Sequence, residues 1–380
     1  MAHDNTAQEE CFAKIEAILN ESVAAGVPGL SAAIYSARGQ WTFTTGVSDL
    51  QKLQPVETTH LFGIGSITKV LVAVVVLQLI EEERLQLSDS VGKILSSEVY
   101  AGIDDGEDAT VMQLLSHTAG IDSWEDDPLW IRKGRGSETD PAHVWKKSEP
   151  LEYIHRSKTT APDPGQYYYS NTNYTLLGLI IENVTKSTVE AEIRQRIIEP
   201  LGMEHIFLEG FERPNKGLLP RRYHWATDTF RDTAGICSSF PELGGNLIDC
   251  TSSNLSTEWA AGGMVSSASD LVKFAAALRD GRLLRPESLA VMKDWRPTTG
   301  PNEVGHGLFR MKRSEDSVWL GHFGGVLGFT GALWWAEKGD CIICVLSNVG
   351  VMHAGDVPSS AAHLILKSQI LELASRLAAE

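Results

Sequence analysis

A serine and a lysine three positions apart, preceded by two glycines, form the segment of this sequence best suited to nucleophilic catalysis. Gly63-Ile64-Gly65-Ser66-Ile67-Thr68-Lys69 runs into the apolar stretch Val70 to Leu77, which predicts a helix that begins at Ser66 and is buried on every side. Residues three apart share a helix face, so the amine of Lys69 is expected beside the Ser66 hydroxyl. A desolvated amine can activate a serine, and backbone N–H groups at a helix start can bind an oxyanion. The structural alternative is that Ser66 only caps the helix.

Two further short motifs contain groups that transfer protons or position a substrate. Tyr169 and Asn171 form a Tyr-x-Asn directly before a run of helical pattern, and His322 and Gly324 form a His-x-Gly ahead of a strand expected to begin near Phe329. Tyrosine clusters usually fill a core or line a pocket, and three tyrosines are consecutive here, so only the spacing to Asn171 selects Tyr169. A buried histidine with a structural role is the alternative for His322.

The elements that must position these motifs are predicted from apolar periodicity and turn residues. A helix at the start of the chain, a hairpin and the serine helix form one end, and a helix, three strands and a closing helix form the other. Ser269 is the N-cap candidate for the helix near the C-terminal end. Besides the serine helix, these elements are expected at residues 12–23, 30–36, 40–46, 269–278, 307–311, 329–336, 341–347 and 361–378.

This order of elements predicts an α/β (α+β) fold with an antiparallel sheet built from both termini and flanked by helices. The α/β lobe is expected to comprise residues 10–83 and 265–375. Between them, residues 84–264 alternate short helical patterns with polar loops, which predicts a mainly helical inserted lobe.

Composition excludes several classes of partner. The 380-residue chain has a net charge of −16 and a pI near 5.2, with no cluster of basic and aromatic residues, so neither nucleic acid nor an anionic membrane is an expected partner. The longest apolar run is too short to span a bilayer, and residues 1–10 lack the pattern of a signal peptide. A cytoplasmic location is therefore predicted, in agreement with five sparsely placed cysteines.

Other polar features of the sequence are interpreted as structural. The acidic clusters at residues 104–108 and 125–127 lack calcium-loop spacing and are predicted to be solvated loops. His117 is interpreted as structural, and the C-x-x-C of Cys341 and Cys344 as part of a buried strand, so no metal site is expected. Three tryptophans of the inserted lobe are expected either to line a substrate pocket or to fill a small core of the loops: Trp124, Trp130 and Trp145.

Ser-x-x-Lys, Tyr-x-Asn and His-x-Gly in this order resemble the motifs of the serine β-lactamase and penicillin-binding-protein superfamily. More specifically, they resemble its branch with class C β-lactamases, DD-peptidases, D-aminopeptidases and family VIII esterases. The resemblance covers about residues 10–375, which implies one serine hydrolase domain of the β-lactamase/transpeptidase type. Further landmarks are Leu114–Ile121, Gly262-Gly263-Met264, Ser267–Leu271 and Leu346-Ser347-Asn348.

The resemblance implies a role for each motif residue. Ser66 is the expected nucleophile, Lys69, kept near neutrality by burial, helps to take its proton, and Tyr169 is the expected general base, with a pKa lowered from ~10 by neighbouring cations. Asn171 is expected to orient Lys69 and the substrate carbonyl. The backbone N–H groups of Ser66 and Gly325 would form the oxyanion hole. The third motif, His322 and Gly324, would help to bind substrate, with His322 where β-lactamases usually have lysine.

The departures from the family pattern define the expected activity. Without the lysine of the third motif, no fixed cation meets the carboxylate of a β-lactam, so efficient penicillin hydrolysis is not expected. We expect a cofactor-independent serine esterase or acyltransferase that forms an acyl-enzyme at Ser66 from an ester, thioester or amide of a small metabolite, a carrier- or CoA-bound acyl donor included. The alternatives are a peptidase or amidase for D-amino-acid substrates, a weak β-lactamase, or an inactive member that serves as a binding or scaffolding module. Sequence does not separate hydrolysis from acyl transfer and predicts no oligomeric state.

Overall fold

Both ends of the chain build one antiparallel sheet in the computed structural model, which describes residues 2–357 and 360–379. Its strands are β1 (Gly29–Ser36), β2 (Gly39–Asp49), β3 (Gln54–Pro55), β10 (Arg296–Pro297), β11 (Glu303–Val304), β12 (Phe309–Lys312), β13 (Val318–Val326), β14 (Phe329–Ala336) and β15 (Ile342–Ser347). The strand order is β10-β11-β12-β13-β14-β15-β1-β2-β3. β1 pairs with β15 from Leu30 with Ser347 to Tyr35 with Ile342, and this pairing joins the N-terminal hairpin to the C-terminal strands.

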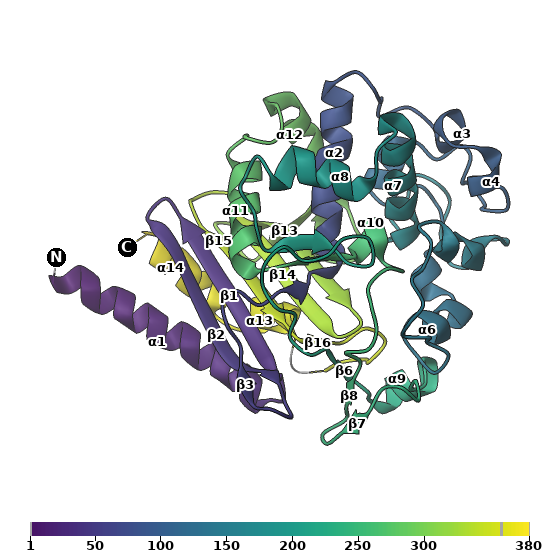
Figure 1. Ribbon diagram of the computed structural model, residues 1–380. Helices are drawn as coiled ribbons and strands as arrows, with labels where there is room; N and C mark the ends of the chain where they lie inside the picture. The colour runs from purple at the N-terminus through teal and green to yellow at the C-terminus, as the bar shows by residue number, and fades with distance from the viewer. Residues whose placement is uncertain (1, 358–359, 380) are drawn as a thin grey trace.

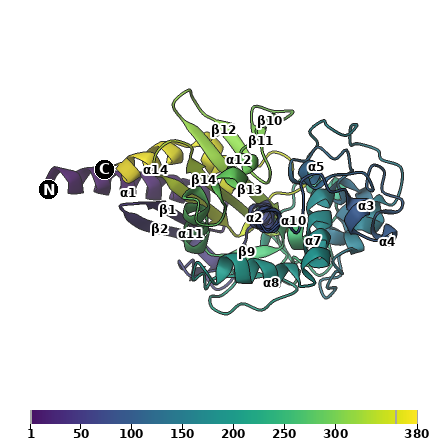
Figure 2. The same cartoon turned by 90° about the horizontal axis from the view of Figure 1, so that it is seen from above.

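Helices cover both faces of this sheet because its buried strands are apolar on both sides. In β1, Ala32 and Ile34 pack into one hydrophobic cluster while Ala33 packs into another, as expected when successive side chains point to opposite faces. The first cluster lies under α1 (Ala2–Ala24), α13 (Ala361–Lys367) and α14 (Ile370–Ala379), with α1 beside α14 (Figures 1 and 2). The second lies under α2 (Thr68–Glu81) and α11 (Ala268–Arg279).

Short helices and strands connect the two halves of the sheet. They lie mainly at the end of the molecule opposite α1 and α14, where α3, α4 and α7 are labelled (Figures 1 and 2). The helices are α3 (Val91–Ile94), α4 (Ser97–Tyr100), α5 (Val111–Leu115), α6 (Pro128–Gly134), α7 (Asn171–Thr185), α8 (Val189–Ile193), α9 (Asp228–Thr233), α10 (Trp259–Gly262) and, later, α12 (Pro286–Met292). Shorter helical turns are η1 (Gly65–Ile67), η2 (Trp124–Asp126), η3 (Glu149–Ile154) and η4 (Arg194–Ile198). The remaining strands are β4 (Phe62–Gly63), β5 (Ile206–Leu208), β6 (Tyr223–Trp225), β7 (Glu242–Leu243), β8 (Leu247–Asp249), β9 (Met264–Ser266) and β16 (Val349–Gly350).

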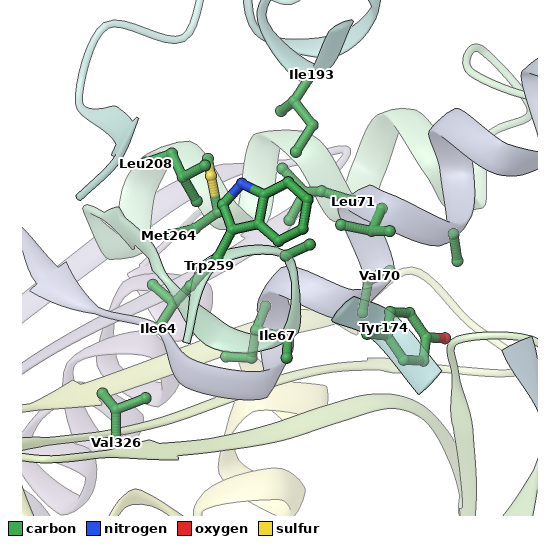
Figure 3. Close-up of a cluster of buried hydrophobic side chains, with 14 of the residues drawn as sticks. Ile64, Ile67, Val70, Leu71, Tyr174, Ile193, Leu208, Trp259, Met264 and Val326 are labelled. Carbon is green, nitrogen blue, oxygen red and sulfur yellow. The ribbon is translucent and has the colours of Figure 1, made fainter. Parts of the chain in front are cut away.

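The serine helix α2 is buried on every side, as its composition predicts. Every residue from Thr68 to Leu77 is buried, and each large aliphatic side chain that is fully buried stabilises the fold by roughly 1.5–3 kcal/mol. Figure 3 shows how Trp259 of α10 and Tyr174 of α7 lie around the first turns of α2. Because β4, directly before η1, pairs with β9, the chain entering α2 is also fixed by backbone hydrogen bonds. The start of α2 is therefore a rigid platform.

The predicted antiparallel sheet with flanking helices is confirmed, and most predicted elements lie within a few residues of the observed ones. The prediction of one continuous closing helix is wrong, because the chain is extended at Ser368, which separates α13 from α14. The N-cap of α11 is Ser267 rather than Ser269, since the Ser267 hydroxyl accepts from the backbone N–H of Asp270.

The strand β13 is missing from the prediction, although it contains the His-x-Gly motif. The prediction placed that motif ahead of a strand, whereas His322 and Gly324 lie within one. Glycines are poor strand formers, and this strand contains three, so its pattern is not that of a strand. Gly324 is needed for a close approach, since a Cβ there would lie 1.9 Å from the carbonyl oxygen of Ile64.

The remaining sequence features have simple structural outcomes. All five cysteines are buried, and burial raises the pKa of Cys341 to about 12 and raises that of Cys344 as well. Among residues 2–357 and 360–379, no helix is both long enough and apolar enough to cross a bilayer.

Candidate active site

Ser66 and Lys69 are brought together at the start of α2, as their spacing predicts. Ser66 lies in the turn η1, where Gly65 adopts a φ of +53°, a left-handed conformation that favours glycine. The Lys69 amine, in the first turn of α2, lies 3.0 Å from the Ser66 hydroxyl oxygen. The Lys69 side chain is completely buried, so its amine is shielded from water.

The amine of Lys69 has an oxygen partner on each of three segments. Besides Ser66, the Lys69 Nζ lies 2.7 Å from Oδ1 of Asn171 in α7 and 2.6 Å from the carbonyl oxygen of Ala261 in α10. Burial lowers the pKa of Lys69 to about 7, although the nearby carboxylates of Glu125 and Glu258 act in the opposite direction. A substantial fraction of Lys69 is therefore neutral near pH 7, in agreement with the prediction for this residue.

Tyr169 is the phenol that reaches this pair. Its ring centroid lies 5.0 Å from the Lys69 amine, and its hydroxyl is close enough to Ser66 for that side chain to influence the pKa of the phenol. The imidazole of His117 stacks on the same ring at 4.3 Å and accepts a hydrogen bond from the backbone N–H of Ser170. His117, which the sequence predicts to be structural, thus packs directly against the ring of Tyr169.

The expected lowering of the Tyr169 pKa is wrong. Burial raises the pKa of this phenol well above 10, the interaction with the Ser66 side chain lowers it only in part, and the negative charge of Glu125 raises it further. The sequence cannot reveal that the nearest cation, Lys69, loses much of its own charge through burial. The Tyr169 phenol is therefore protonated in the resting site.

The two neighbouring tyrosines face other partners. The hydroxyl of Tyr168 donates to Asp126 at 2.7 Å, and the ring of Tyr167 packs edge-on against Phe309 at 6.5 Å. Of the three consecutive tyrosines, Tyr169 is the one in contact with the serine and the lysine, which is the position that the spacing to Asn171 selects.

The His-x-Gly motif forms the opposite wall of the site. β13 runs beside η1 so closely that a Cβ on Gly65 would lie 2.5 Å from the backbone nitrogen of Gly325. The N–H groups of Ser66 and Gly325 thus come from adjacent segments. Burial lowers the pKa of His322 to about 3, and its Nδ1 is hydrogen-bonded to the Phe323 carbonyl oxygen. His322 is therefore a neutral ring with Nδ1–H as donor and no substitute for a lysine charge.

A cavity of about 350 Å³ opens directly in front of Ser66. Ser66, Tyr169, Asn302, His322, Thr330 and Ser360 contribute the polar side chains of its wall. Most of the rest is apolar: Phe309, Phe323, Trp334, Val351, Met352 and Ala362, with backbone from Gly324 and Gly325. No Asp, Glu, Lys or Arg occurs among the described residues that line it. The cavity is of a size that suits a small ligand with an apolar group.

Sequence reasoning missed a group of buried charges behind Lys69. The guanidinium of Arg135, at the end of α6, lies 2.5 Å from Glu125 and 2.7 Å from Glu258, and Asn171 donates its amide hydrogen to Glu125. Glu125 was predicted to lie in a solvated loop with Asp126 and Asp127. That prediction is wrong for Glu125, whose side chain is only 12% exposed, whereas Asp126 is exposed.

The signal that could have found this group is weak. Glu125 and Arg135 lie on either side of helix α6, and Glu258 directly precedes α10. These residues belong to separate elements, so their proximity becomes visible only in the folded chain. The tryptophans of the same region fill the core of the loops rather than the cavity: Trp124 and Trp130 lie 4.6 Å apart and Trp145 is buried. In the part of the chain that the structure describes, no group of His, Cys, Asp and Glu side chains has the arrangement of a metal site.

Comparison with known proteins identifies the family. A family model described as Beta-lactamase matches residues 14–364. The chain belongs to the Beta-lactamase family. This confirms the resemblance inferred from the three motifs and, together with the structural matches below, the fold class.

Individual relatives agree with this assignment. The chain is 30% identical over 231 residues to the putative penicillin-binding protein PbpX of Bacillus subtilis, an alignment that covers 61% of this chain and 49% of PbpX. The chain thus spans about half the length of that relative, and a smaller part of the Staphylococcus aureus protein flp.

Solved structures match over almost the whole chain. A D-stereospecific amidohydrolase from Streptomyces sp. matches with a TM-score of 0.77 and 29% identity, covering 89% of this chain and 94% of that one. A D-amino acid amidase from Ochrobactrum anthropi SV3, in complex with D-phenylalanine, matches with a TM-score of 0.80 and 27% identity, covering 96% and 98%. Proteins described as an amidohydrolase and an amidase thus share this architecture.

Proposed function

We propose that this protein is a serine hydrolase that forms an acyl-enzyme at Ser66 from an ester or amide with an apolar acyl group. The observation that carries the proposal is the 3.0 Å contact between the Ser66 hydroxyl and a buried amine whose pKa lies near 7, at the edge of a cavity. A scaffold protein would gain nothing from a desolvated lysine beside an accessible serine, since burying an amine costs free energy.

Acylation begins when neutral Lys69 accepts the proton of the Ser66 hydroxyl as its oxygen attacks the substrate carbonyl. The C–O bond forms while the carbonyl π electrons move to its oxygen, and the N–H groups of Ser66 and Gly325 are positioned to bind that oxyanion. When the tetrahedral intermediate collapses, the phenol of Tyr169 gives its proton to the leaving alcohol or amine. The resulting phenolate is stabilised by the Lys69 ammonium, 5.0 Å from the ring, which then returns the proton.

Release of the acyl group uses the same groups in reverse. A water molecule attacks the acyl carbonyl, gives up its proton to the Lys69 and Tyr169 pair, and the Ser66 oxygen leaves and is protonated again. An alcohol or amine in place of water would give acyl transfer, and a thioester donor would react by the same steps. Both activities therefore belong to one mechanism, and hydrolysis needs no further binding site.

The cavity supports an apolar acyl group. Its wall brings together Phe323, Trp334 and Met352, and no Asp, Glu, Lys or Arg occurs in its described lining. A substrate carboxylate, such as that of a β-lactam, would meet a neutral His322 there instead of a lysine. Weak or absent penicillin turnover is expected for this reason.

Amides of D-amino acids are the second candidate substrates. The observation that favours them is the near-complete structural match to proteins described as a D-stereospecific amidohydrolase and a D-amino acid amidase. The direct comparison is between p-nitrophenyl esters of arylacetic acids and the amides of D- and L-phenylalanine, assayed on the same preparation. A preference for the amide by kcat/KM would make the second candidate the first.

Labelling with a fluorophosphonate probe tests the proposal. Intact mass should show a single adduct, peptide mapping should place it on Ser66, and Ser66→Ala should abolish both the adduct and the burst of p-nitrophenol from an ester. Ser314→Ala, at an exposed position outside the cavity, is the matched control and should react like the wild type. An adduct on another serine, or an unlabelled wild type, would contradict the proposal.

A further inference from the structure

The amide of Asn171 lies between the lysine of the site and the buried charges behind it. Its Oδ1 accepts from the Lys69 amine at 2.7 Å, while its Nδ2 donates to Oε2 of Glu125. An amide can be turned by half a rotation, which would exchange oxygen and nitrogen, and the partners on its two sides decide which orientation is stable. A carboxylate accepts hydrogen bonds and donates none, so Glu125 permits one orientation of Asn171.

That orientation determines where the lone pair of neutral Lys69 points. A neutral amine has two N–H groups and one lone pair. Asn171 Oδ1 and the Ala261 carbonyl oxygen, at 2.7 and 2.6 Å, can only accept, so they take both N–H groups. The third oxygen within hydrogen-bond distance is that of Ser66, 3.0 Å away, and its hydroxyl must then donate to the lone pair. This is the arrangement in which the lysine is a base for the serine.

We propose that Glu125 is a positioning residue for catalysis: by accepting the Asn171 amide hydrogen, it fixes the orientation that directs the lone pair of Lys69 to Ser66. The inference rests on the proposed function, because it concerns how the same serine is activated. Glu125 does not line the cavity and need not touch substrate to act in this way.

Several contacts hold Glu125 in its position. Its Oε1 lies 2.5 Å from the Arg135 guanidinium, which is held in turn by Glu258 at 2.7 Å and by Nε2 of His353 at 3.1 Å. The η2 segment is also fixed to the start of α7, since the Ser123 hydroxyl accepts from the backbone N–H of Asn171 at 3.1 Å. Burial alone would raise the pKa of Glu125, but the charge and hydrogen bond of Arg135 outweigh it, so the pKa is lowered and the carboxylate stays ionised.

The same carboxylate influences the charge on Lys69. The charged groups that act on that amine are Glu125, Glu258 and Arg135. The phenols Tyr169 and Tyr174 and the imidazoles His117 and His322 also lie near it, and His353 contacts Arg135. The imidazoles are neutral at pH 7, because burial lowers the pKa of His322 to about 3, that of His353 to about 4 and that of His117 well below 6.5. Glu125 raises the pKa of Lys69, so its removal should lower that pKa.

Glu125→Gln tests the proposal without a change of size. The new amide presents an N–H group either to Arg135 or to Asn171, and both are donors, so the pairing is frustrated. We expect kcat to fall on the order of 10-fold to 10²-fold with little change in KM, as for a small misplacement of a catalytic group. The acid limb of kcat/KM should move to lower pH. Asp126→Asn is the matched control: it removes a carboxylate one residue away, which binds Tyr168, and should leave both kcat and the limb unchanged.

The double variant Glu125→Gln with Asn171→Asp makes the test independent of general damage. The introduced glutamine can accept from Arg135 and donate to the introduced aspartate, whose other oxygen accepts from Lys69, so every donor again has an acceptor. We expect kcat to recover above the acid limb. The limb should move to higher pH than in the wild type, because a carboxylate then contacts Lys69 directly.

Each outcome separates the possibilities. Wild-type kcat and an unmoved limb in Glu125→Gln would overturn the proposal, and so would a rise in KM confined to substrates with an amino group, which would make Glu125 a substrate ligand. If Glu125→Gln does not fold, the double variant decides, since a folded double variant whose kcat stays low above its acid limb is evidence against the positioning role. An unlabelled wild type after fluorophosphonate treatment would instead refute the proposed function itself.

Discussion

The two sides of Ser66 differ in kind. Behind it, Lys69 is surrounded by oxygen acceptors and by the buried ions around Arg135, which pair with each other. In front of it, the described wall of the cavity has no ion, and Phe323 and Trp334 pack together with ring centroids 4.8 Å apart. The charged side positions and tunes the reacting groups, whereas the neutral side offers shape and apolar surface to the substrate.

The difference also appears in the elements that build the two sides. The charged side lies at the ends of α2, α6, α7 and α10, which are fixed by packing and by backbone hydrogen bonds. The cavity side consists of three adjacent strands of the large sheet, β12 to β14, together with residues near the C-terminal end such as Met352 and Ser360. This contrast teaches that changes on the charged side should alter kcat and its pH dependence, while changes on the cavity side should alter the choice of substrate.

Among the variants that compare the two sides of Ser66, the largest effect is expected for Tyr169→Phe. Removal of the hydroxyl deprives the leaving group of its proton donor, so kcat should fall on the order of 10² to 10⁴, the usual worth of a proton-transfer group. Folding should be retained, because the ring still stacks on His117. Steady-state kinetics with an ester, together with thermal unfolding, measure both quantities.

Tyr167→Phe is the control for the tyrosine cluster. Its ring packs edge-on against Phe309 on the cavity side and against His117, and both contacts survive the loss of the hydroxyl, so a small change in rate is expected. A large loss for Tyr167→Phe beside normal activity of Tyr169→Phe would place the catalytic phenol elsewhere in the cluster.

The pH dependence of acylation should reflect the pKa of Lys69 on the charged side of Ser66. Since Lys69 acts as a base only when it is neutral and burial lowers its pKa to about 7, kcat/KM should rise with pH through about 7. Below that pH, activity should fall by about tenfold per unit, as for one required deprotonation. Profiles of kcat/KM between about pH 5 and 9 measure the limb around the Lys69 pKa, and a flat profile in this range would show that Lys69 is not the base.

Phe323→Ala tests whether the cavity side determines the choice between bulky and small acyl groups. The half-buried ring loses its contact with a bulky acyl group, so kcat/KM for a phenylacetyl ester should fall by about tenfold, equivalent to about 1.4 kcal/mol. The acetyl ester, which does not reach the ring, should be affected much less, and the acid limb should stay in place. Equal losses for both esters would assign Phe323 to the reacting groups instead of the selective wall.

On the charged side, the sequence predicts Ser66, Lys69 and Asn171 but not the buried ions behind them. Ser66 and Lys69 are found from helix spacing, and Asn171 from a short motif, because all three lie where local pattern fixes direction. The burial of Glu125 is not predicted, because its acidic neighbours resemble a solvated loop and loops have no periodicity that shows which side chain turns inward. The raised pKa of Tyr169 is not predicted for a related reason, since it depends on burial by segments that are distant in the sequence.

The fold shows the same limit. Strands with apolar runs, such as β14 and β15, are predicted almost to the residue, because apolar burial is a property of the local sequence. β13 is missed because it contains three glycines, one of which, Gly324, makes a close contact with Ile64, which lies far earlier in the chain. Tertiary contact here overrides local propensity.

The smallest effect is expected for His322→Asn, which tests whether the cavity side of Ser66 carries no charge. The ring is already neutral near pH 7, since burial lowers its pKa to about 3, so its removal takes no charge from the surroundings of Lys69. The acid limb of kcat/KM should therefore stay where the wild type has it, and activity on a neutral ester should change less than about tenfold, the worth of one net hydrogen bond. A limb displaced by a full pH unit would mean that His322 is charged in the working enzyme, and the division between a charged and a neutral side of Ser66 would then fail.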